Sequence, residues 1–448
     1  MKIYSLFEDN TCQCANVNDN IDVDNLHPIE NPTEYFAGFK DKIYDFSAWP
    51  VEAILKILAQ LPRIWSDRKH FVQTHFGDKG VNFLIPWLSE KNLLHILNLA
   101  FRNNYSYLDK FVSNSDQTAI KLKACPRGIV IHWLAGNIPI LGMLSLVQGL
   151  LTKNLNVVKV SKYFGPVLPK LCESITTIEV EVNGKAYFGK DLMQHVKIVY
   201  CPPEDADAHT FLSRISDVRI FWGGKEAIEI LQSYPKRTTT EDVVFGPKYS
   251  FGVIDRESIN KNNADALGKQ FAFDASILDQ YGCNSPHTIF VETGGEISPS
   301  EFAKILANSM AKIAVQIPKR PITQDEAATI LNIRAKYDFN GEAHYPKGTE
   351  WTVIYSEEEE GLAEPCFSRV IFVKPIENIL NVLDFIDENK QTIGTAISEK
   401  RLETFAVEST LRGVARCTQP GRMTMYDYPW DGMFPMDRLT RWVSLQCF

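Results

Sequence analysis

The stretch GIVIHWLAGNIPILGMLSLVQGLLTKNLNVVKV, residues 128–160, indicates the fold class of this chain. It begins with a short, almost wholly apolar run at 128–133 and continues with an apolar segment that is long enough for a helix. It ends with a second apolar run at 156–160. Fully apolar strands separated by helices are typical of a parallel sheet whose two faces are covered by helices. The stretch therefore predicts the first strand–helix–strand unit of an α/β domain.

The same rhythm continues beyond this stretch. A helix is predicted from Pro166, and apolar runs follow at 195–202 and 217–224, each with a helical segment after it. Four strand–helix units in a row predict a parallel sheet, and such sheets bind ligands in the crevice at the carboxyl ends of their strands. By its architecture, this part of the chain is predicted to be a nucleotide-binding domain.

A second α/β set begins near Tyr249 and predicts a further domain. Apolar runs at 249–255, 287–292 and 369–375 alternate with helical segments, and the segment 376–389 also predicts a helix.

The two ends of the chain differ from this pattern. Residues 1–45 are polar and weakly periodic, so we expect an arm or a loosely packed cap, and amphipathic helices follow it. We expect four parts: an N-terminal arm and helices packing on the cofactor domain (1–115), a nucleotide-binding domain (116–245), a catalytic domain (246–415) and a tail that is a candidate oligomer contact (416–448).

The composition excludes several classes of protein. The 448 residues are 45% hydrophobic and 23% charged, and the net charge of −8 without a basic stripe argues against a nucleic-acid surface. The longest apolar run, 137–151, is too short to span a bilayer, and the first residues do not form a signal peptide. Nine scattered cysteines fit a reducing cytoplasm. Cys12 and Cys14 lie close together without a second pair or a His cluster, so we expect no metal site.

Four polar residues lie at or just after the carboxyl ends of the first two predicted strands. Asn137 is either the N-cap of the next helix or a hydrogen-bond donor to an oxyanion. Lys159 ends a buried strand, with Ser161 and Lys162 just after it. Two ammonium groups in a crevice at the end of a sheet suit the ribose or phosphate of a nucleotide, although two solvated lysines at the rim are the simpler alternative.

Two further candidates lie in turns. Gly223 and Gly224 separate a predicted strand from a helix, where a backbone can approach a pyrophosphate closely; a plain tight turn also explains them. Cys283 lies in a glycine turn before a buried strand. It is either a small buried hydrophobe or a nucleophile that faces the nucleotide crevice. His287 falls within the following strand, which makes it a poor base for a Cys–His pair.

Taken in order, five segments resemble the LuxC family of fatty acyl-CoA reductases, which belongs to the aldehyde dehydrogenase superfamily. The resemblance runs from about residue 120 to the C-terminus. It implies an α/β fold of the aldehyde dehydrogenase type, with a Rossmann-type parallel-sheet cofactor domain and a second α/β catalytic domain. The segments are GIVIHWLAGNIP, LLTKNLNVVKVSKYFGP, IFWGGKEAI, DQYGCNSPHTIFVE and YPWDG.

The resemblance also implies roles for single residues. Cys283 matches the superfamily's nucleophile and Asn137 its oxyanion-hole asparagine. Lys159 matches the lysine that holds the cofactor ribose, and the glycine pair at 223–224 matches a turn close to the cofactor. Ser161 lies in the same cofactor-binding segment as Lys159.

Three departures from the superfamily pattern carry information. Val244 stands where hydrolytic members have a glutamate that activates water, so an acyl-cysteine should not be hydrolysed readily. Lys162 stands where NAD-dependent members often have a glutamate that binds the adenosine ribose, and a lysine there favours NADPH over NADH. Glu364 is one place out of register with the later cofactor motif, so a ribose contact from it is only weakly implied.

The implied activity is NADPH-dependent reduction of a long-chain fatty acyl thioester to an aldehyde through an acyl-cysteine intermediate. The acyl donor is expected to be acyl-CoA or an acyl-protein, with an acyl-protein synthetase as a candidate partner and a homo-oligomer as the expected assembly. Two alternatives stay open at this point: a hydrolytic NAD-dependent aldehyde dehydrogenase, and a non-catalytic scaffold that keeps only the fold.

Overall fold

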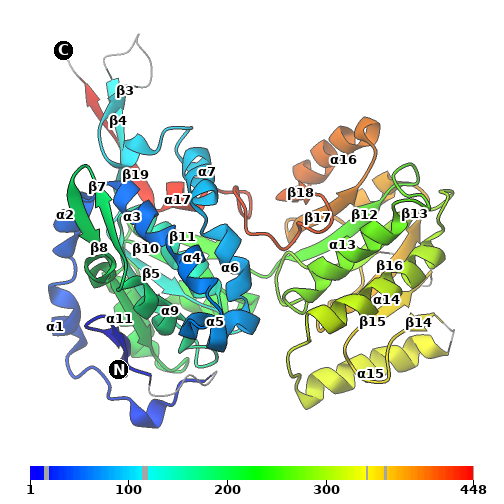
Figure 1. Cartoon of the computed structure of the whole chain (residues 1–448), viewed down its shortest axis with the longest axis horizontal. Helices are drawn as coiled ribbons and strands as arrows, with labels where there is room; N and C mark the ends of the chain where they lie inside the picture. Colours follow the sequence, from blue (N-terminus) through cyan, green and yellow to red (C-terminus); the bar gives the residue numbers. More distant parts are fainter. Residues whose placement is uncertain (15–19, 114–119, 340–341, 358–360, 447–448) are drawn as a thin grey trace. The chain divides into compact units, whose positions relative to one another are not determined.

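The computed structural model describes residues 1–14, 20–113, 120–339, 342–357 and 361–446 (Figure 1). The chain forms two compact units. The first contains residues 1–246 and the second contains residues 247–426. The predicted tail is shared, because 427–429 and 433–448 belong to the first unit and 430–432 to the second.

The first unit is built on a seven-stranded sheet. Five neighbouring strands run parallel, as the strand–helix pattern predicted, and the remaining two, at one edge of the sheet, each pair antiparallel with their neighbours. The strand order is β11 (Glu241–Phe245), β10 (Val218–Trp222), β5 (Ile129–Trp133), β6 (Leu155–Lys159), β9 (Val196–Tyr200), β1 (Tyr4–Glu8) and β2 (Thr11–Cys12).

The expectation of a loose arm over residues 1–45 is wrong for its first part. Strand β1 pairs antiparallel with β9, and Ile3, Leu6 and Phe7 are buried. The sequence pattern did not predict this strand because it is short and surrounded by polar residues. Its stability comes from pairing with a strand that lies far away in the sequence.

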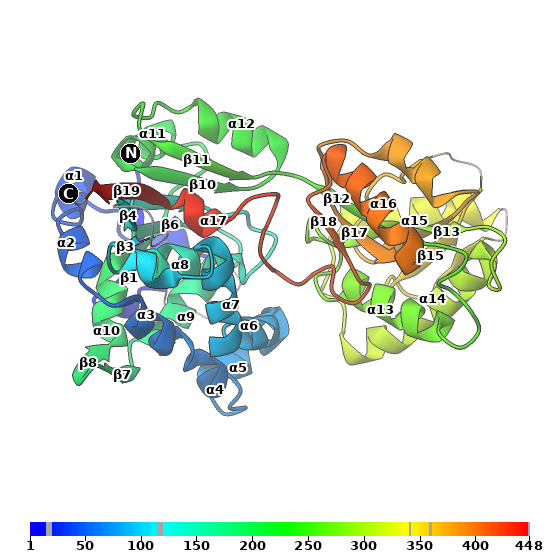
Figure 2. The same ribbon diagram turned by 90° about the horizontal axis from the view of Figure 1, so that it is seen from above.

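Helices cover both faces of this sheet, which is the arrangement that fully apolar strands require. Figure 2 shows α11 (Ala206–Ile215) and α12 (Lys225–Ser233) on one side and α8 (Leu141–Leu151) on the other, where α9 (Val167–Ile175) also packs. Every residue of α8 is buried, because the sheet and further helices surround it. The N-terminal helices are α1 (Pro32–Ala37), α2 (Lys42–Ser47), α3 (Val51–Leu58), α4 (Leu61–Trp65), α5 (Phe71–Phe76), α6 (Val81–Trp87) and α7 (Glu90–Ala100).

The first unit also contains elements that the sequence pattern did not predict. A hairpin of β7 (Glu179–Val182) and β8 (Lys185–Phe188), followed by α10 (Gly189–Leu192), lies between α9 and β9. A separate three-stranded sheet joins the C-terminal strand to two strands that precede the first sheet's central strands in the sequence. In it, β19 (Thr440–Gln446) pairs along the whole of β4 (Ile120–Pro126), which also pairs with β3 (Val112–Ser113); α17 (Pro435–Arg438) precedes β19.

The second unit contains another seven-stranded sheet, parallel except for β14 at one edge. Helices α13 (Ala264–Ser276) and α14 (Pro299–Gln316) pack on one face, and α16 (Glu399–Leu411) packs on the other. The order is β14 (Ala343–His344), β15 (Thr352–Tyr355), β16 (Val370–Ile376), β13 (Pro286–Glu292), β12 (Tyr249–Ile254), β17 (Lys390–Ala396) and β18 (Arg416–Thr418).

Two helical segments of the second unit differ from expectation. The segment 376–389 contains a short 3-10 helix, η5 (Ile379–Phe385), instead of the predicted helix. Its apolar residues Ile379 and Val382 are three apart, a spacing that aligns side chains in a 3-10 turn. Helix α15 (Gln324–Asp338) was not predicted, and a capping box between Thr323 and Glu326 begins it.

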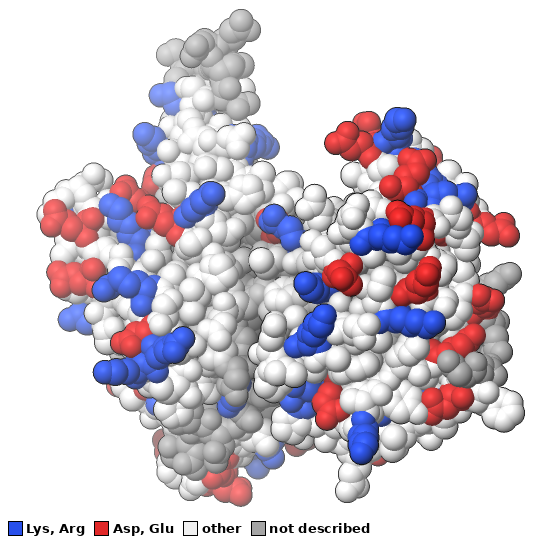
Figure 3. Space-filling model, turned by 45° about the vertical axis from the view of Figure 1, so that its right-hand side comes forward, with Lys and Arg blue, Asp and Glu red and all other residues white. Residues whose placement is uncertain are grey.

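The surface and the helices agree with the composition. On the face shown in Figure 3, Lys and Arg side chains are interspersed with Asp and Glu rather than gathered in a basic stripe. No helix within the described residues is both long and apolar enough to cross a membrane.

Candidate functional site

Lys159 is the last residue of β6, at the carboxyl edge of the first sheet. Its side chain is only 9% exposed, and burial lowers the pKa of its ammonium. Among the described residues, no hydrogen-bond acceptor or carboxylate pairs with this ammonium. A buried charge without a partner is unfavourable unless a ligand supplies one. The geometry thus fits a residue that is kept for a bound polar group.

The loop after Lys159 carries the other two predicted cofactor residues. The Ser161 Oγ accepts a hydrogen bond from the Tyr163 N–H at 3.3 Å, and Lys162 is exposed. A Cβ placed on Gly136 would lie 2.4 Å from the Ser161 Oγ, so the loops after β5 and β6 are in close contact. The structure thus brings Lys159, Ser161 and Lys162 to the same edge of the sheet as the loop that holds Asn137.

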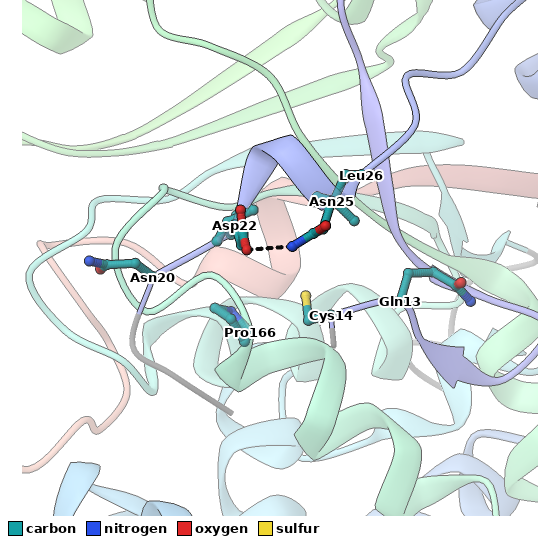
Figure 4. Close-up of a pocket in the computed structure, with 8 residues that line it drawn as sticks. Gln13, Cys14, Asn20, Asp22, Asn25, Leu26 and Pro166 are labelled. Atoms are coloured by element: carbon teal, nitrogen blue, oxygen red, sulfur yellow. Dashed lines mark hydrogen bonds between the residues drawn. The ribbon is translucent and has the colours of Figure 1, made fainter. Parts of the chain in front are cut away.

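Residues 20–26 support this loop, a role that the sequence did not predict. The Ile21 N–H donates to the Lys162 carbonyl at 2.9 Å, and a Cβ on Gly165 would lie 2.3 Å from the Ile21 side chain. Figure 4 shows this segment across a small hollow from Pro166. The hollow measures about 20 Å³, which is room for about one water molecule, so it is too small for a cofactor. The polar pattern of residues 1–45 gave no signal of this supporting role.

Asn137 lies in the loop between β5 and α8, and its side chain is exposed. Helix α8 begins at Leu141, and its N-cap residue is Ile140. Asn137 is therefore not the N-cap, which removes the structural alternative considered for it. Pro139, a residue type that suits the first turn of a helix, lies two residues before the start of α8. The role of Asn137 as an oxyanion donor stays a prediction.

Gly223 and Gly224 form the turn between β10 and α12. Neither has a positive φ, so the backbone conformation does not require glycine. A Cβ on Gly223 would have its nearest neighbour at 3.8 Å, and one on Gly224 would meet nothing within 4 Å. The space beside this turn is open, which fits close approach by a ligand.

Val244, the residue expected to replace a catalytic carboxylate, lies in β11 and pairs in register with Phe221 of β10. Its side chain is half-buried and packs against the apolar core of the sheet. This position therefore supplies no base.

Cys283 lies in the loop between α13 and β13 and is partly exposed. Its carbonyl accepts a hydrogen bond from the Ser250 Oγ at 2.7 Å, which ties the loop to β12. Burial, together with the nearby Asp431 carboxylate, raises the pKa of the thiol to about 12, against smaller lowering effects from Gln391, the Cys283 backbone N–H and Lys248. At neutral pH this residue is therefore a thiol, and a nucleophilic role for it would require formation of the thiolate.

Two left-handed turns hold the Cys283 loop in place. Asp279 and Gln280 have positive φ just before the loop. The three consecutive residues from Phe367 to Arg369 also have positive φ, immediately before strand β16. The turns are joined by an ion pair between Arg369 Nε and Asp279 Oδ1 at 2.5 Å and by a hydrogen bond from the Ser368 N–H to the Asp279 carbonyl at 3.0 Å. Non-glycine residues adopt this conformation only where the surroundings enforce it. The loop therefore has a fixed shape.

The two remaining candidates of the second unit have no evident catalytic role. His287 lies inside β13, as expected, and burial lowers its pKa to about 4. Glu364 is exposed, and its ribose contact stays a prediction. Within the described ranges, no group of three or more His, Cys, Asp or Glu side chains forms a metal site. Asn137 and Lys159 belong to the first unit and Cys283 to the second, so each half of the predicted site is a property of its own unit.

Comparison with known sequences confirms the resemblance found above. The family described as acyl-CoA reductase (LuxC) matches residues 46–442. A long-chain acyl-protein thioester reductase of Aliivibrio fischeri is 26% identical over 368 residues, which are 81% of this chain and 72% of that protein. The protein of the same name from Vibrio harveyi is 27% identical over 332 residues, covering 72% of this chain and 65% of that protein.

Comparison with solved structures confirms the aldehyde dehydrogenase-like fold. The substrate-bound AldH of Staphylococcus aureus superposes with a TM-score of 0.66 at 11% identity, covering 94% of this chain and 95% of that one. The NADP complex of an NADP-dependent glyceraldehyde-3-phosphate dehydrogenase from Bacillus halodurans superposes with a TM-score of 0.62 at 13% identity, covering 92% and 90%. At such identities the likeness concerns the fold alone.

Proposed function

The chain belongs to the LuxC family of acyl-CoA reductases, and from this premise we propose that it reduces a long-chain fatty acyl thioester to the aldehyde with NADPH. The acyl group passes through a thioester on Cys283. The observation that carries this proposal is a partly exposed cysteine in a loop that an ion pair and two left-handed turns hold in place. The valine at position 244, where the resemblance places the carboxylate of hydrolytic members, agrees with it.

In the first step, the Cys283 sulfur attacks the thioester carbonyl, a bond forms between sulfur and the acyl carbon, and the carrier thiol leaves with the proton. Thiolates suit this reaction because they are strong nucleophiles even at low population. Negative charge develops on the carbonyl oxygen, and we assign its stabilisation to the Asn137 side-chain N–H and the Cys283 backbone N–H. Loss of one such donor typically slows a reaction by about 10²–10³-fold.

In the second step, the acyl group leaves Cys283 as the aldehyde. The reduced nicotinamide, when bound, supplies the hydride for the acyl carbon. The Cys283 sulfur then departs as the thiolate, and this departure needs no general base. Val244 agrees with this assignment, since the absence of a carboxylate there keeps water from hydrolysing the acyl-cysteine.

For the cofactor we propose a site at the carboxyl edge of the first sheet. The buried Lys159 ammonium has no partner among the described residues and fits the ribose hydroxyl groups. The open turn at Gly223 and Gly224 leaves room for close approach. Ser161 belongs to the same loop, and the exposed Lys162 is the candidate partner of a 2′-phosphate, which favours NADPH.

The acyl donor is proposed to be acyl-CoA or an acyl-protein, since two similar proteins are named acyl-protein thioester reductases. An acyl-protein synthetase is the partner that such a donor implies. We further propose a homo-oligomer in the cytoplasm, with the tail that carries β19 as the candidate contact between subunits.

Intact-mass spectrometry tests the covalent step. The protein is mixed with acyl-CoAs of increasing chain length, and with the same acyl groups on an acyl carrier protein, without reduced cofactor. We expect an adduct of acyl mass that hydroxylamine removes and that Cys283→Ala lacks. Addition of NADPH should then release aldehyde and not free acid. Failure of every donor to form an adduct would refute the acyl-cysteine route, and release of free acid would favour a hydrolytic enzyme.

A further inference from the structure

Gln391 is the second residue of β17 and lies beside the Cys283 loop with its side chain only 1% exposed. The next residue, Thr392, donates its N–H to the Ser250 Oγ at 3.1 Å, and that hydroxyl donates to the Cys283 carbonyl. The start of β17 is thus fixed to the backbone of the nucleophile. The Gln391 side chain lies close enough to the Cys283 sulfur to lower the pKa of its thiol, against the larger effect of burial, which raises it.

Asp431 holds the other side of this amide. Its carboxylate accepts a hydrogen bond from the Gln391 Nε2. The residue has a φ of 47°, and the following Gly432 also has a positive φ, so a left-handed turn directs the carboxylate inward. Such a conformation is unfavourable for a non-glycine residue and persists where the surrounding structure enforces it.

The carboxylate determines which way the amide faces. An ionised Asp431 can only accept hydrogen bonds, so it selects the orientation in which the amide nitrogen faces it. In that orientation the Gln391 Oε1 is buried without a hydrogen-bond partner among the described residues. A buried amide oxygen without a partner is unfavourable, so the Asp431 carboxylate is needed to maintain this orientation. The orientation leaves the second hydrogen of Nε2 available to the Cys283 sulfur.

We propose that Gln391 donates a hydrogen bond to the Cys283 sulfur that stabilises the attacking thiolate, and that Asp431 is a positioning residue that keeps Gln391 in the donating orientation. The catalytic use of this thiolate rests on the proposed function. The arrangement takes the place of a general base beside the nucleophile, since Val244 and His287 supply none.

The groups around the Cys283 thiol shift its pKa in opposite directions. The Asp431 carboxylate raises the pKa of Cys283 through its charge, whereas Gln391 and Lys248 lower it. Burial raises the pKa of Asp431 itself, against the effects of the same Gln391 and Lys248. Asp431 therefore acts in two opposite ways: directly through its charge, and indirectly through the amide that it orients.

The test is the pH profile of Cys283 alkylation by iodoacetamide, followed on the peptide that contains this residue. In Gln391→Leu, loss of a hydrogen bond to the thiolate should slow alkylation about ten- to hundredfold at a fixed pH below the pKa and move the profile to higher pH. Gln391→Met keeps the length of the side chain and should behave in the same way. Thr392→Val is the matched control, because its hydroxyl has no partner and its backbone N–H is retained. An unchanged profile in both Gln391 variants would overturn the proposal.

A double-mutant cycle tests the positioning role. Asp431→Asn removes the charge, so in the Gln391→Leu background it should move the profile to lower pH. In the wild-type background, Asp431→Asn also allows the Gln391 amide to rotate away from the donating orientation. The shift of the alkylation profile to lower pH should therefore be smaller or reversed. Equal moves in both backgrounds would show that Asp431 does not act through Gln391.

These measurements use neither acyl donor nor cofactor, so they separate this inference from the proposed function. Adduct formation on the wild type together with unaltered alkylation of the Gln391 variants would leave the function standing and remove the inference. Absence of an adduct on the wild type, together with slowed alkylation of the Gln391 variants, would support this inference and refute the proposed function.

Discussion

Replacement of Lys159 by methionine is expected to stabilise the first unit and, at the same time, to weaken NADPH binding. The ammonium is buried at the end of β6 without a partner among the described residues, whereas methionine fills a similar volume without a charge. Burial of an unsatisfied polar group costs about 1–3 kcal/mol in proteins. Removal of this cost should raise the melting temperature of the apoprotein by several degrees.

The expected loss of binding is of similar size. A hydrogen bond from a charged group contributes about 1.5–3 kcal/mol, so Lys159→Met should raise the Kd for NADPH about ten- to hundredfold. Binding can be followed by NADPH fluorescence, and stability by thermal unfolding without cofactor. Because burial lowers the pKa of Lys159 in the folded state, the unfolded state binds more protons as the pH rises toward the ordinary lysine pKa. The wild type should therefore gain stability in that range, and the difference between the two proteins should narrow.

Lys153→Met is the matched control. Lys153 is also buried, but its ammonium donates to the Asp109 carboxylate at 2.5 Å and to the Leu108 carbonyl at 3.0 Å. Its replacement should lower stability by about 1–3 kcal/mol, because it leaves those acceptors unpaired, and should leave NADPH affinity unchanged. A destabilised Lys159→Met, or one that binds NADPH as tightly as the wild type, would refute the assignment of Lys159 as a residue kept for the cofactor.

Three further outcomes are expected. Cys283→Ala should lose both the acyl adduct and aldehyde formation, while thermal unfolding shows an intact fold; turnover by this variant would exclude the covalent route. Lys162→Glu should weaken NADPH at least tenfold more than NADH in fluorescence titrations, since a carboxylate repels the 2′-phosphate; equal effects would contradict the role given to this lysine. Alkylation of Cys283 should keep rising about tenfold per pH unit well above pH 9, because burial raises the pKa of its thiol to about 12; a plateau near pH 8.5 would show an ordinary thiol.

Local sequence patterns were sufficient to predict the two α/β units and the position of Cys283 in a loop. Apolar runs such as 129–133 and 155–159 form buried strands, because their side chains are removed from water on both faces only between two layers of helices. The glycine turn before β13 located Cys283 in a loop. The segment 376–389, in contrast, was misassigned, because an apolar spacing of three to four residues fits a short 3-10 turn as well as a helix.

The surroundings of the candidate site residues became visible in the folded chain, where distant segments meet. The sequence could not show that β1 joins the first sheet, that residues 20–26 support the Lys162 loop, or that Lys159 is left without a partner. It also could not show that Gln391 and Asp431 meet beside Cys283. The physical reason is that the pKa of a buried group and the pairing of an edge strand depend on atoms from distant parts of the chain. Local patterns in the sequence record only what each segment does by itself.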